Sequence, residues 1–346
     1  MQFRLTLPPL LKIYSDALES GDASLALVFE MLVAAIGVMD KSSIVTYHTK
    51  IFEQCLLALD LRHEHPKSIK IIDGVEKNVI HAIVTLTLRL TESMFRPLFL
   101  QSLEWAESEV VEHDSLALRS VNRNISFYNL VNKMAEEQRS LFVPYFKYLI
   151  DGSTRYLTEQ DNDSNSLSQK HKKRKINGDI KLKNGSLSPE KWHLRALILN
   201  SLYKCFLYDT GNLKFLNATN FQLVADPPTM EDQLSDIPTV EEVDLILVCC
   251  LGQMAVAVGS DDIWKQLNHD VLMQTRSEKL RPRILGLKVV KFLMEHLKEE
   301  YLVLLPETIP FLGELLEDSE HIVKSLAQSV FKELESISGE NLRRYL

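Results

Sequence analysis

Close pairs of histidines and carboxylates are the residues of this chain whose spacing could do chemistry. His63-Glu64-His65 is the closest histidine pair, and the following Pro66 indicates a helix end or a loop. Two imidazoles in a loop could bind a metal, but no second ligand pair accompanies them, so an exposed polar turn is the better interpretation. Asp261-Asp262 directly precedes an apolar helical pattern, and helix capping together with pairing with the helix dipole explains it better than acid–base catalysis.

The usual motifs of catalysis and nucleotide binding do not occur in the sequence. There is no G-x-G-x-x-G, G-x-x-x-x-G-K-[ST], G-x-S-x-G or H-E-x-x-H stretch. His81 and His193 fall in helical patterns and are interpreted as packed side chains. No C-x-x-C pair is present, which favours buried cysteines in a reducing compartment; the four are Cys55, Cys205, Cys249 and Cys250. We therefore expect a protein that is not an enzyme, with no metal, no cofactor and no small-molecule substrate.

The composition is that of a globular protein with an acidic surface. The chain has 346 residues, 45% of them hydrophobic and 25% charged, and a formal net charge of −8. An acidic chain repels phosphate on average, which leaves only a local basic patch for contact with RNA. Ala23–Met39 is the most apolar stretch, but it is too short for a membrane span and contains Glu30, so it predicts a buried helix and no membrane partner. The first residues, Met1–Arg4, predict no signal peptide.

Apolar residues three and four positions apart dominate the chain and predict helices almost throughout. One such stripe consists of Ile44, His48, Ile51, Cys55 and Leu59. Asp73 is expected to begin a helix at Val75–Leu90, and Ser188-Pro189-Glu190 places a capping side chain before a proline. Thr239 and Glu242 form a capping-box pattern before an apolar run. No turn sequence joins two alternating segments into a convincing hairpin, so we expect an all-α protein.

The carboxy-terminal part of the sequence predicts a pair of antiparallel helices. Leu304–Asp318 reads as one amphipathic helix, and a second is expected to begin at Ser319. Its inner face is expected to comprise Ile322, Val323, Leu326, Ala327, Val330 and Leu334. The small residue Ala327 would let the two helices approach closely. Such a pair is typical of a HEAT repeat and equally of any antiparallel pair in a helical bundle. A HEAT-type α-solenoid is the fold we predict.

One polar region interrupts the helical pattern. Residues 158–188 contain almost no periodic apolar positions, so burial cannot offset the entropy of ordering them. We expect a long disordered basic loop there, between helical repeats at residues 1–157 and 189–346. Its basic run comprises Lys170, Lys172, Lys173, Arg174 and Lys175. A nuclear-import signal is favoured for this run, a solvated linker comes second and an RNA-contacting tail third, and these roles are not exclusive.

Several segments together resemble one protein family. The chain is similar to the carboxy-terminal end of the large nucleolar HEAT-repeat proteins of the small-subunit processome, a family of small-nucleolar-RNA-associated proteins. The matching segments occur in the family's order, from about Phe95 to the last residue. They are Phe95–Phe99, Glu104–Ala106, Ser126–Tyr128, Leu141–Phe146, Glu300-Tyr301, Leu304–Asp318, Gly339–Leu342 and Tyr345-Leu346.

The resemblance implies a non-enzymatic scaffold in the nucleolus of the cell nucleus. Members of the family are much longer α-solenoids that assemble with other processome proteins on the precursor of the small ribosomal subunit. They support maturation of 18S ribosomal RNA and transcription of ribosomal RNA by polymerase I. Precursor ribosomal RNA and small nucleolar RNA are implied partners, reached indirectly or through the basic loop. The family carries no catalytic motif, so no catalytic residue is implied.

The alternative is a generic HEAT-repeat adaptor of the nuclear-transport or phosphatase-scaffold type. A solenoid offers a long surface for large partners in either case. The carboxy-terminal pattern favours the processome scaffold, and a transport receptor would not need an import signal of its own. Trp105 and Trp264 could anchor a partner helix if exposed, although packing between repeats is the more ordinary role for both. An enzyme would require a cleft lined by titratable groups with perturbed pKa values.

Overall fold

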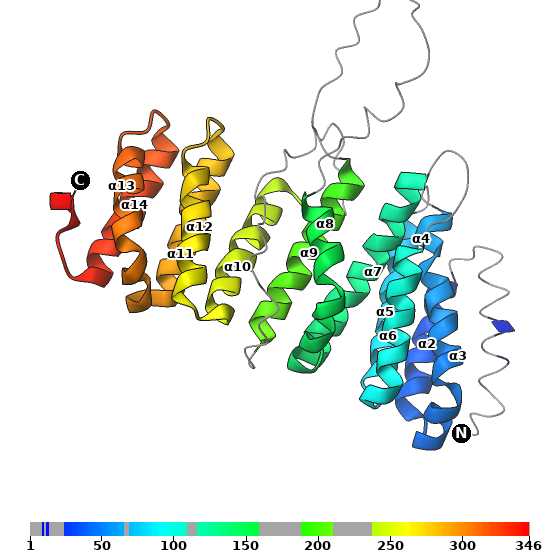
Figure 1. The fold of residues 1–346 in the computed structure, drawn as a ribbon. Helices are drawn as coiled ribbons and strands as arrows, with labels where there is room; N and C mark the ends of the chain where they lie inside the picture. The colour runs from blue at the N-terminus through cyan, green and yellow to red at the C-terminus, as the bar shows by residue number, and fades with distance from the viewer. Residues whose placement is uncertain are drawn as a thin grey trace, which may run out of the picture. The chain divides into compact units, whose positions relative to one another are not determined.

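The computed structural model describes residues 9, 12–13, 24–65, 69–108, 116–158, 188–209 and 237–345. Over these residues the chain forms helices and no strand, which confirms the predicted all-α class (Figure 1). It divides into two compact units, an amino-terminal unit (Met1–Arg139) and a carboxy-terminal unit (Ser140–Leu346). The loop predicted at residues 158–188 lies outside the described residues except for its two end positions.

The amino-terminal unit is a stack of helices with α5 at its centre. Helix α2 packs along α5, which also contacts α3, α4 and α7, and α6 packs on α7. The helices are α2 (Leu25–Val38), α3 (Lys41–Leu59), the single turn α4 (Leu61–Glu64), α5 (Ile69–Thr87), α6 (Glu92–Glu107) and α7 (Leu116–Gln138). The predicted stripe on α3 is confirmed, because Ile44, Ile51, Cys55 and Leu59 are buried and His48 is half-buried.

The carboxy-terminal unit repeats a simple arrangement of paired helices. Helices α9 and α10 pair, as do α11 with α12 and α13 with α14, while α12 also packs on both α10 and α14. The α-helices are α8 (Ile150–Thr158), α9 (Pro189–Tyr208), α10 (Val240–Val258), α11 (Asp261–Thr275), α12 (Leu280–Leu297), α13 (Leu305–Leu316) and α14 (His321–Ser338). The 3-10 turns are η2 (Arg139–Leu141), η3 (Val143–Tyr148), η4 (Lys298–Leu304) and η5 (Leu342–Tyr345).

Two of the predicted helix starts are confirmed by their capping contacts. The Ser188 hydroxyl accepts a hydrogen bond from the Lys191 amide at 3.3 Å, and Pro189 is the first residue of α9. Thr239 caps α10, with its hydroxyl accepting from the Glu242 amide and its own amide donating to the Glu242 carboxylate. These contacts satisfy backbone donors that the first turn of a helix leaves unpaired.

The helix start predicted at Asp73 is wrong, and the interpretation of Asp261-Asp262 is right for pairing with the helix dipole but wrong for capping. Helix α5 begins at Ile69, so Asp73 lies inside it, where its carboxylate pairs with Arg62. Helix α11 begins at Asp261, and Ser260 occupies the cap position. The two aspartates therefore lie in the first turn, where their negative charge interacts favourably with the positive end of the helix dipole. A carboxylate in the first turn and one at the cap give nearly the same sequence signal.

The carboxy-terminal helix pair is confirmed in type and corrected in its boundaries. Leu304 ends the 3-10 turn η4, α13 covers only Leu305–Leu316, and the second helix begins at His321 instead of Ser319. Most of the expected inner face is buried, but Ile322 is exposed and Leu326 is half-buried. Ala327 is fully buried, in agreement with close packing at this position.

Close helix packing in the carboxy-terminal unit depends on two glycines. A Cβ atom at Gly252 of α10 would lie 1.9 Å from the Phe292 ring of α12. A Cβ atom at Gly286 of α12 would lie 2.7 Å from Thr275 Cγ2 and 3.0 Å from the Val271 carbonyl oxygen of α11. Both glycines therefore allow the paired helices to approach more closely than a larger residue would permit.

Candidate functional site

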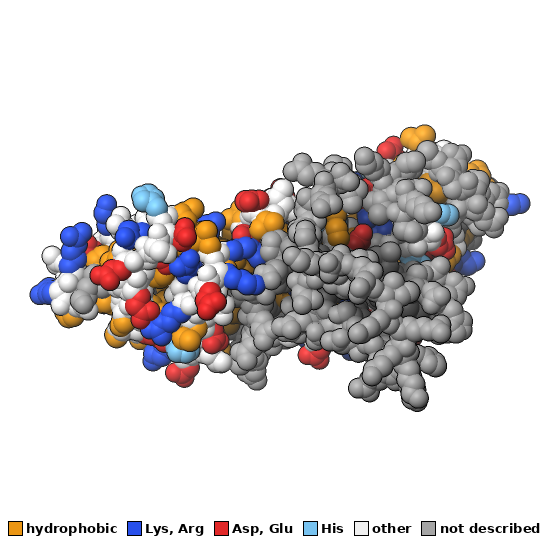
Figure 2. Space-filling model, turned by 90° about the horizontal axis from the view of Figure 1, so that it is seen from above, with side chains coloured by type: hydrophobic (Ala, Val, Ile, Leu, Met, Phe, Trp, Pro, Cys, Tyr) orange, Lys and Arg blue, Asp and Glu red, His pale blue; other side chains and the backbone are white. Residues whose placement is uncertain are grey.

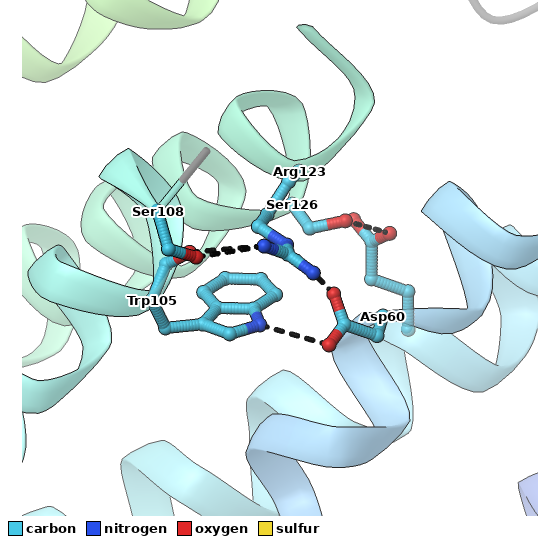
Figure 3. A network of polar contacts seen from close by, with 6 residues as sticks. Asp60, Trp105, Ser108, Arg123 and Ser126 are labelled. Atoms are coloured by element: carbon cyan, nitrogen blue, oxygen red, sulfur yellow. Dashed lines mark hydrogen bonds and ion pairs between the residues drawn. The ribbon is translucent and has the colours of Figure 1, made fainter. Parts of the chain in front are cut away.

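Polar side chains in the amino-terminal unit converge beside α4, where α3 ends. The Asp60 carboxylate accepts hydrogen bonds from Arg123 Nε of α7 at 2.8 Å and from the Trp105 indole nitrogen of α6 at 3.0 Å (Figure 3). The Arg123 guanidinium also donates to Ser108 Oγ at 2.9 Å and lies 5.4 Å from the centre of the Trp105 ring. One aspartate thus joins the carboxy-terminal ends of α3 and α6 to α7.

A second buried cluster surrounds Glu76 of α5. The Glu76 carboxylate accepts from Arg62 Nε at 2.8 Å, from Ser126 Oγ at 2.9 Å and from Asn129 Nδ2 at 2.7 Å. The side chains of Arg62 and Glu76 are only 5% and 4% exposed. Burial lowers the pKa of Arg62, and the Glu76 and Asp73 carboxylates outweigh that effect and raise it. The charge on Arg62 is therefore fixed and compensated.

These two clusters hold helices together and do not form a reaction centre. Every named donor in them has a carboxylate or hydroxyl acceptor inside the same unit. Neither cluster leaves a group directed at a substrate position, as a catalytic pair would. No local sequence pattern predicts this arrangement, because Asp60 and Arg123 are 63 positions apart, Glu76 and Ser126 are 50 positions apart, and each pair meets only after folding.

The carboxy-terminal unit contains a comparable polar contact around Tyr301. The Tyr301 hydroxyl donates to Asn268 Oδ1 at 3.1 Å and lies 3.0 Å from Thr308 Oγ1. Burial raises the pKa of the Tyr301 phenol, so the group remains protonated at neutral pH. Asn268 also donates to the Glu307 carboxylate at 2.9 Å. The group joins α11, η4 and α13, and its polar atoms are again used within the fold.

Both tryptophans that were considered as partner anchors take part in internal packing. Trp264 is buried, and its indole nitrogen donates to the Ala255 carbonyl at 2.8 Å, joining α11 to α10. Trp105 is half-buried and donates to Asp60. The interpretation of both residues as packing aromatics is therefore confirmed.

The histidines divide into different environments. His63 lies in α4 and is half-buried, and His65 follows the helix as an exposed residue. Over the described parts of the chain, no group of three or more His, Cys, Asp and Glu side chains could hold a metal ion. His193 is half-buried, whereas His81 is exposed on α5, so its interpretation as a packed histidine is wrong. Its helical position was predicted correctly, but its face was not.

The four cysteines are unpaired and poorly reactive. Cys55, Cys205 and Cys250 are buried, and burial raises the pKa of each thiol, so each stays protonated at neutral pH. Cys249 is half-buried, and burial raises its pKa as well. The interpretation of Cys250 as a buried apolar residue is confirmed, and that of Cys249 is only partly right. Neither Cys249 nor Cys250 is in a position where its thiol would act as a nucleophile.

The exposed surface of the carboxy-terminal helices carries charges of both signs. Lys and Arg side chains alternate with Asp and Glu over the carboxy-terminal helices, with apolar atoms between them (Figure 2). Several basic groups are neutralised locally, as Arg276 is by Glu314, Arg281 by Asp244 and Arg283 by Asp318. The basic run from Lys170 to Lys175 falls outside the described residues. In the described part of the chain, no helix is both long and apolar enough for a membrane span.

Comparison with known proteins places this chain among HEAT-repeat proteins. Residues 43–214 match the model of the BP28CT (NUC211) domain. An uncharacterised protein of Arabidopsis thaliana is 53% identical over 99% of the chain. HEAT repeat-containing protein 1 of Homo sapiens is 31% identical over 99% of the chain, and U3 small nucleolar RNA-associated protein 10 of Candida glabrata is 27% identical over 100% of it.

The relatives are much longer than this chain. The matched region covers 16% of the Arabidopsis protein, 15% of the human protein and 18% of the Candida protein. The helical pairs and the HEAT-repeat relatives together confirm the predicted α-solenoid class. The family resemblance inferred from the carboxy-terminal segments is confirmed too. This chain belongs to the family of HEAT repeat-containing protein 1 and U3 small nucleolar RNA-associated protein 10, and it corresponds to the C-terminal region of that family.

Proposed function

We propose that this chain is a non-enzymatic scaffold segment that docks in the small-subunit processome during ribosome biogenesis. The observation that carries the proposal is the similarity of nearly the whole chain to proteins named for association with U3 small nucleolar RNA. On this proposal the chain resides in the nucleolus, contacts other processome proteins and supports maturation of 18S ribosomal RNA. Support of ribosomal RNA transcription by polymerase I is part of the same proposal.

The fold supports such a role physically. In the carboxy-terminal unit, consecutive helix pairs pack on one another through α12, which contacts both α10 and α14. Stacked helix pairs of this kind give solenoid proteins a surface suited to large partners. The polar clusters around Asp60, Glu76 and Tyr301 stiffen the helices instead of serving catalysis. An acidic chain with a net charge of −8 favours basic protein partners at least as much as RNA.

Affinity purification of the tagged chain from nuclear extract tests the proposal. Proteins and RNA recovered with the chain are identified together, with an untagged extract as the background. We expect early processome proteins and U3 small nucleolar RNA with precursor ribosomal RNA. Recovery of import receptors or of a phosphatase alone would instead support the generic HEAT adaptor.

We further propose a division of the chain into helical repeats at residues 1–157 and 189–346, joined by a polar basic loop at 158–188. The loop would direct nuclear import through Lys170, Lys172, Lys173, Arg174 and Lys175. The support is the sequence itself, since five cationic side chains within six positions suit recognition by an acidic groove. A solvated linker is the second interpretation of the same run and contact with RNA phosphates the third, and the three roles are not exclusive.

Two deletions of equal length within this loop separate these roles. Deletion of Gln169–Ile176 removes the basic run, and deletion of Asp161–Ser168 removes neighbouring polar residues as the matched control. Import through the run predicts that only the first deletion shifts the tagged chain from the nucleus to the cytoplasm. If both variants stay nuclear, crosslinking of the loop to precursor RNA distinguishes an RNA contact from a linker.

A further inference from the structure

Helix α10 carries a mainly apolar row on its exposed side. Leu245 is 64% exposed and Val256 is 37% exposed, while Cys249 and Gln253 between them are half-buried. Their spacing of three and four positions places these residues along one side of the helix. Contiguous apolar surface on the outside of a helix is a common mark of contact with a protein partner.

Helix α12 carries a cationic row with the same helical spacing. It consists of the half-buried Ile284, the exposed Lys288 and the half-buried Lys291. Lys288 forms no ion pair in the part of the chain that the structure describes. Lys291 lies 3.8 Å from the Glu295 carboxylate, and both of these side chains are more than a third exposed. An exposed pair of this kind is weak, so both lysines remain available to an anionic partner.

Two contacts between α10 and α12 place these rows side by side. Arg281 of α12 pairs with Asp244 of α10, and a Cβ atom at Gly252 of α10 would lie 1.9 Å from the Phe292 ring of α12. These contacts follow in the same order along both helices, so the helices run parallel. Gly252 is one turn beyond the middle of the apolar row, and Phe292 is one turn beyond Lys288, so the two rows flank this contact. We call the surface that they form the α10–α12 face, which comprises Leu245, Cys249, Val256, Ile284, Lys288 and Lys291.

We propose that the α10–α12 face binds an acidic amphipathic helix of a protein partner. Apolar side chains of that helix cover the row on α10, and its Asp or Glu side chains lie beside Lys288 and Lys291. A helix suits the face because Leu245 and Val256 are about 16 Å, or about three turns, apart along α10. The formal net charge of −8 favours basic partners on average, and this face is a local exception.

The combination of apolar and cationic residues favours a protein over RNA as the partner. Phosphate groups would pair with the lysines, but an RNA backbone offers nothing apolar to cover Leu245. The core of a protein interface, in contrast, is formed by apolar side chains, with charges at its rim. The inference names a class of partner for the proposed scaffold role and rests on that role.

Photocrosslinking in cells tests the proposal with the full tagged chain. The photoreactive residue p-benzoylphenylalanine replaces Leu245, and crosslinked peptides are sequenced by mass spectrometry. We expect peptides of another protein in which Asp and Glu alternate with apolar residues at helical spacing. The same photoreactive residue in place of Met273, which is 44% exposed on α11, samples a different surface and should not yield these peptides.

A charge reversal tests the contribution of α12. Lys288→Glu should lower the yield of the crosslink from position 245 about tenfold, because the new carboxylate repels the acidic side chains of the partner. Lys265→Glu on α11 is the matched control, since Lys265 is also exposed and outside the α10–α12 face. This control should keep the full yield. Circular dichroism verifies that both variants are folded.

Several outcomes would overturn the proposal. Position 245 could give no crosslink, or it could crosslink to RNA, to another copy or part of this chain, or to peptides without acidic residues. An unchanged yield with Lys288→Glu would contradict the proposal as well. Copurification separates this inference from the scaffold role. Processome proteins recovered without the expected crosslink would refute the α10–α12 face alone, whereas a failure to recover them would refute the scaffold role.

Discussion

Glu76 links three helices of the amino-terminal unit, because three donors from two other helices meet its buried carboxylate. Glu76→Ala should destabilise this unit by about 3–5 kcal/mol, since Arg62 then keeps a buried charge with only Asp73 as its partner. Denaturant unfolding followed by circular dichroism measures the change.

The matched control for this substitution is Glu137→Ala on α7. Glu137 pairs with Lys133 at 2.9 Å, but its side chain is 42% exposed. Exposed pairs contribute about 0–1 kcal/mol, so the control should unfold close to the parent chain. An equal decrease in the free energy of unfolding for the two variants would show that the cluster around Glu76 stabilises the unit no more than an exposed ion pair does.

Thiol reactivity offers a second residue-scale prediction. Burial raises the pKa of Cys55, Cys205 and Cys250, so these thiols stay protonated and covered at neutral pH. The folded chain should therefore label with iodoacetamide only at Cys249, and slowly, because burial raises its pKa as well. Denaturation should expose all four thiols, as counted by mass spectrometry. Rapid labelling of Cys205 in the folded chain would contradict its position in the core.

Single residues were predicted well where local sequence decides their environment and poorly where tertiary contacts do. Thr239 and Glu242 are three positions apart, so their reciprocal cap could be read directly. Asp73 carried the same kind of signal, but its carboxylate is used by Arg62, eleven positions earlier. The contact between Asp60 and Arg123 spans 63 positions, and no local pattern reports it.

At the scale of elements, packing of α11 on α12 sets a strict limit on residue size at Gly286. Gly286→Ala should destabilise the carboxy-terminal unit by about 1–3 kcal/mol, because the new methyl group would meet Thr275 and the Val271 backbone. Gly74→Ala is the control, since no atom lies within 4 Å of its added Cβ. That substitution should stabilise α5 by about 0.5–1 kcal/mol through helix propensity. Thermal unfolding should thus move in opposite directions for the two variants.

Helix capping gives the second prediction at this scale. Thr239→Ala removes the hydroxyl that accepts from the Glu242 amide, and it should cost about 1 kcal/mol. Thr239→Ser keeps the acceptor and should stay close to the parent chain. Chemical denaturation distinguishes the two, and equal stability of both variants would show that the cap is dispensable.

Element types were easier to predict from the sequence than their boundaries or exposed faces. The three- and four-residue spacing identified α10 and α14, because one buried face suffices to produce it. Ala23–Met39 was expected to be a buried helix, yet Leu27, Met31 and Val38 of α2 are exposed in the structure. Periodicity reports which residues are apolar, and it cannot report which neighbour is present to cover them.

At the scale of the whole molecule, the proposed scaffold role would rest on the surfaces that helix pairs present. The family could be recognised from the sequence because its segments combine packing residues with a characteristic ending, and the comparison with known relatives agrees. Partner choice depends on the exposed face of each helix and on loops, neither of which follows from helical spacing. Those features therefore need experiments in cells.

Sedimentation of the tagged chain from nuclear extract is the most direct test of the proposed scaffold role. A chain that docks in the processome should sediment with large particles containing U3 small nucleolar RNA, and mild RNase treatment should release it from them. The chain alone has a mass of 39.6 kDa and would remain near the top of the gradient. Sedimentation only at that position, in cells that actively make ribosomes, would contradict the scaffold account.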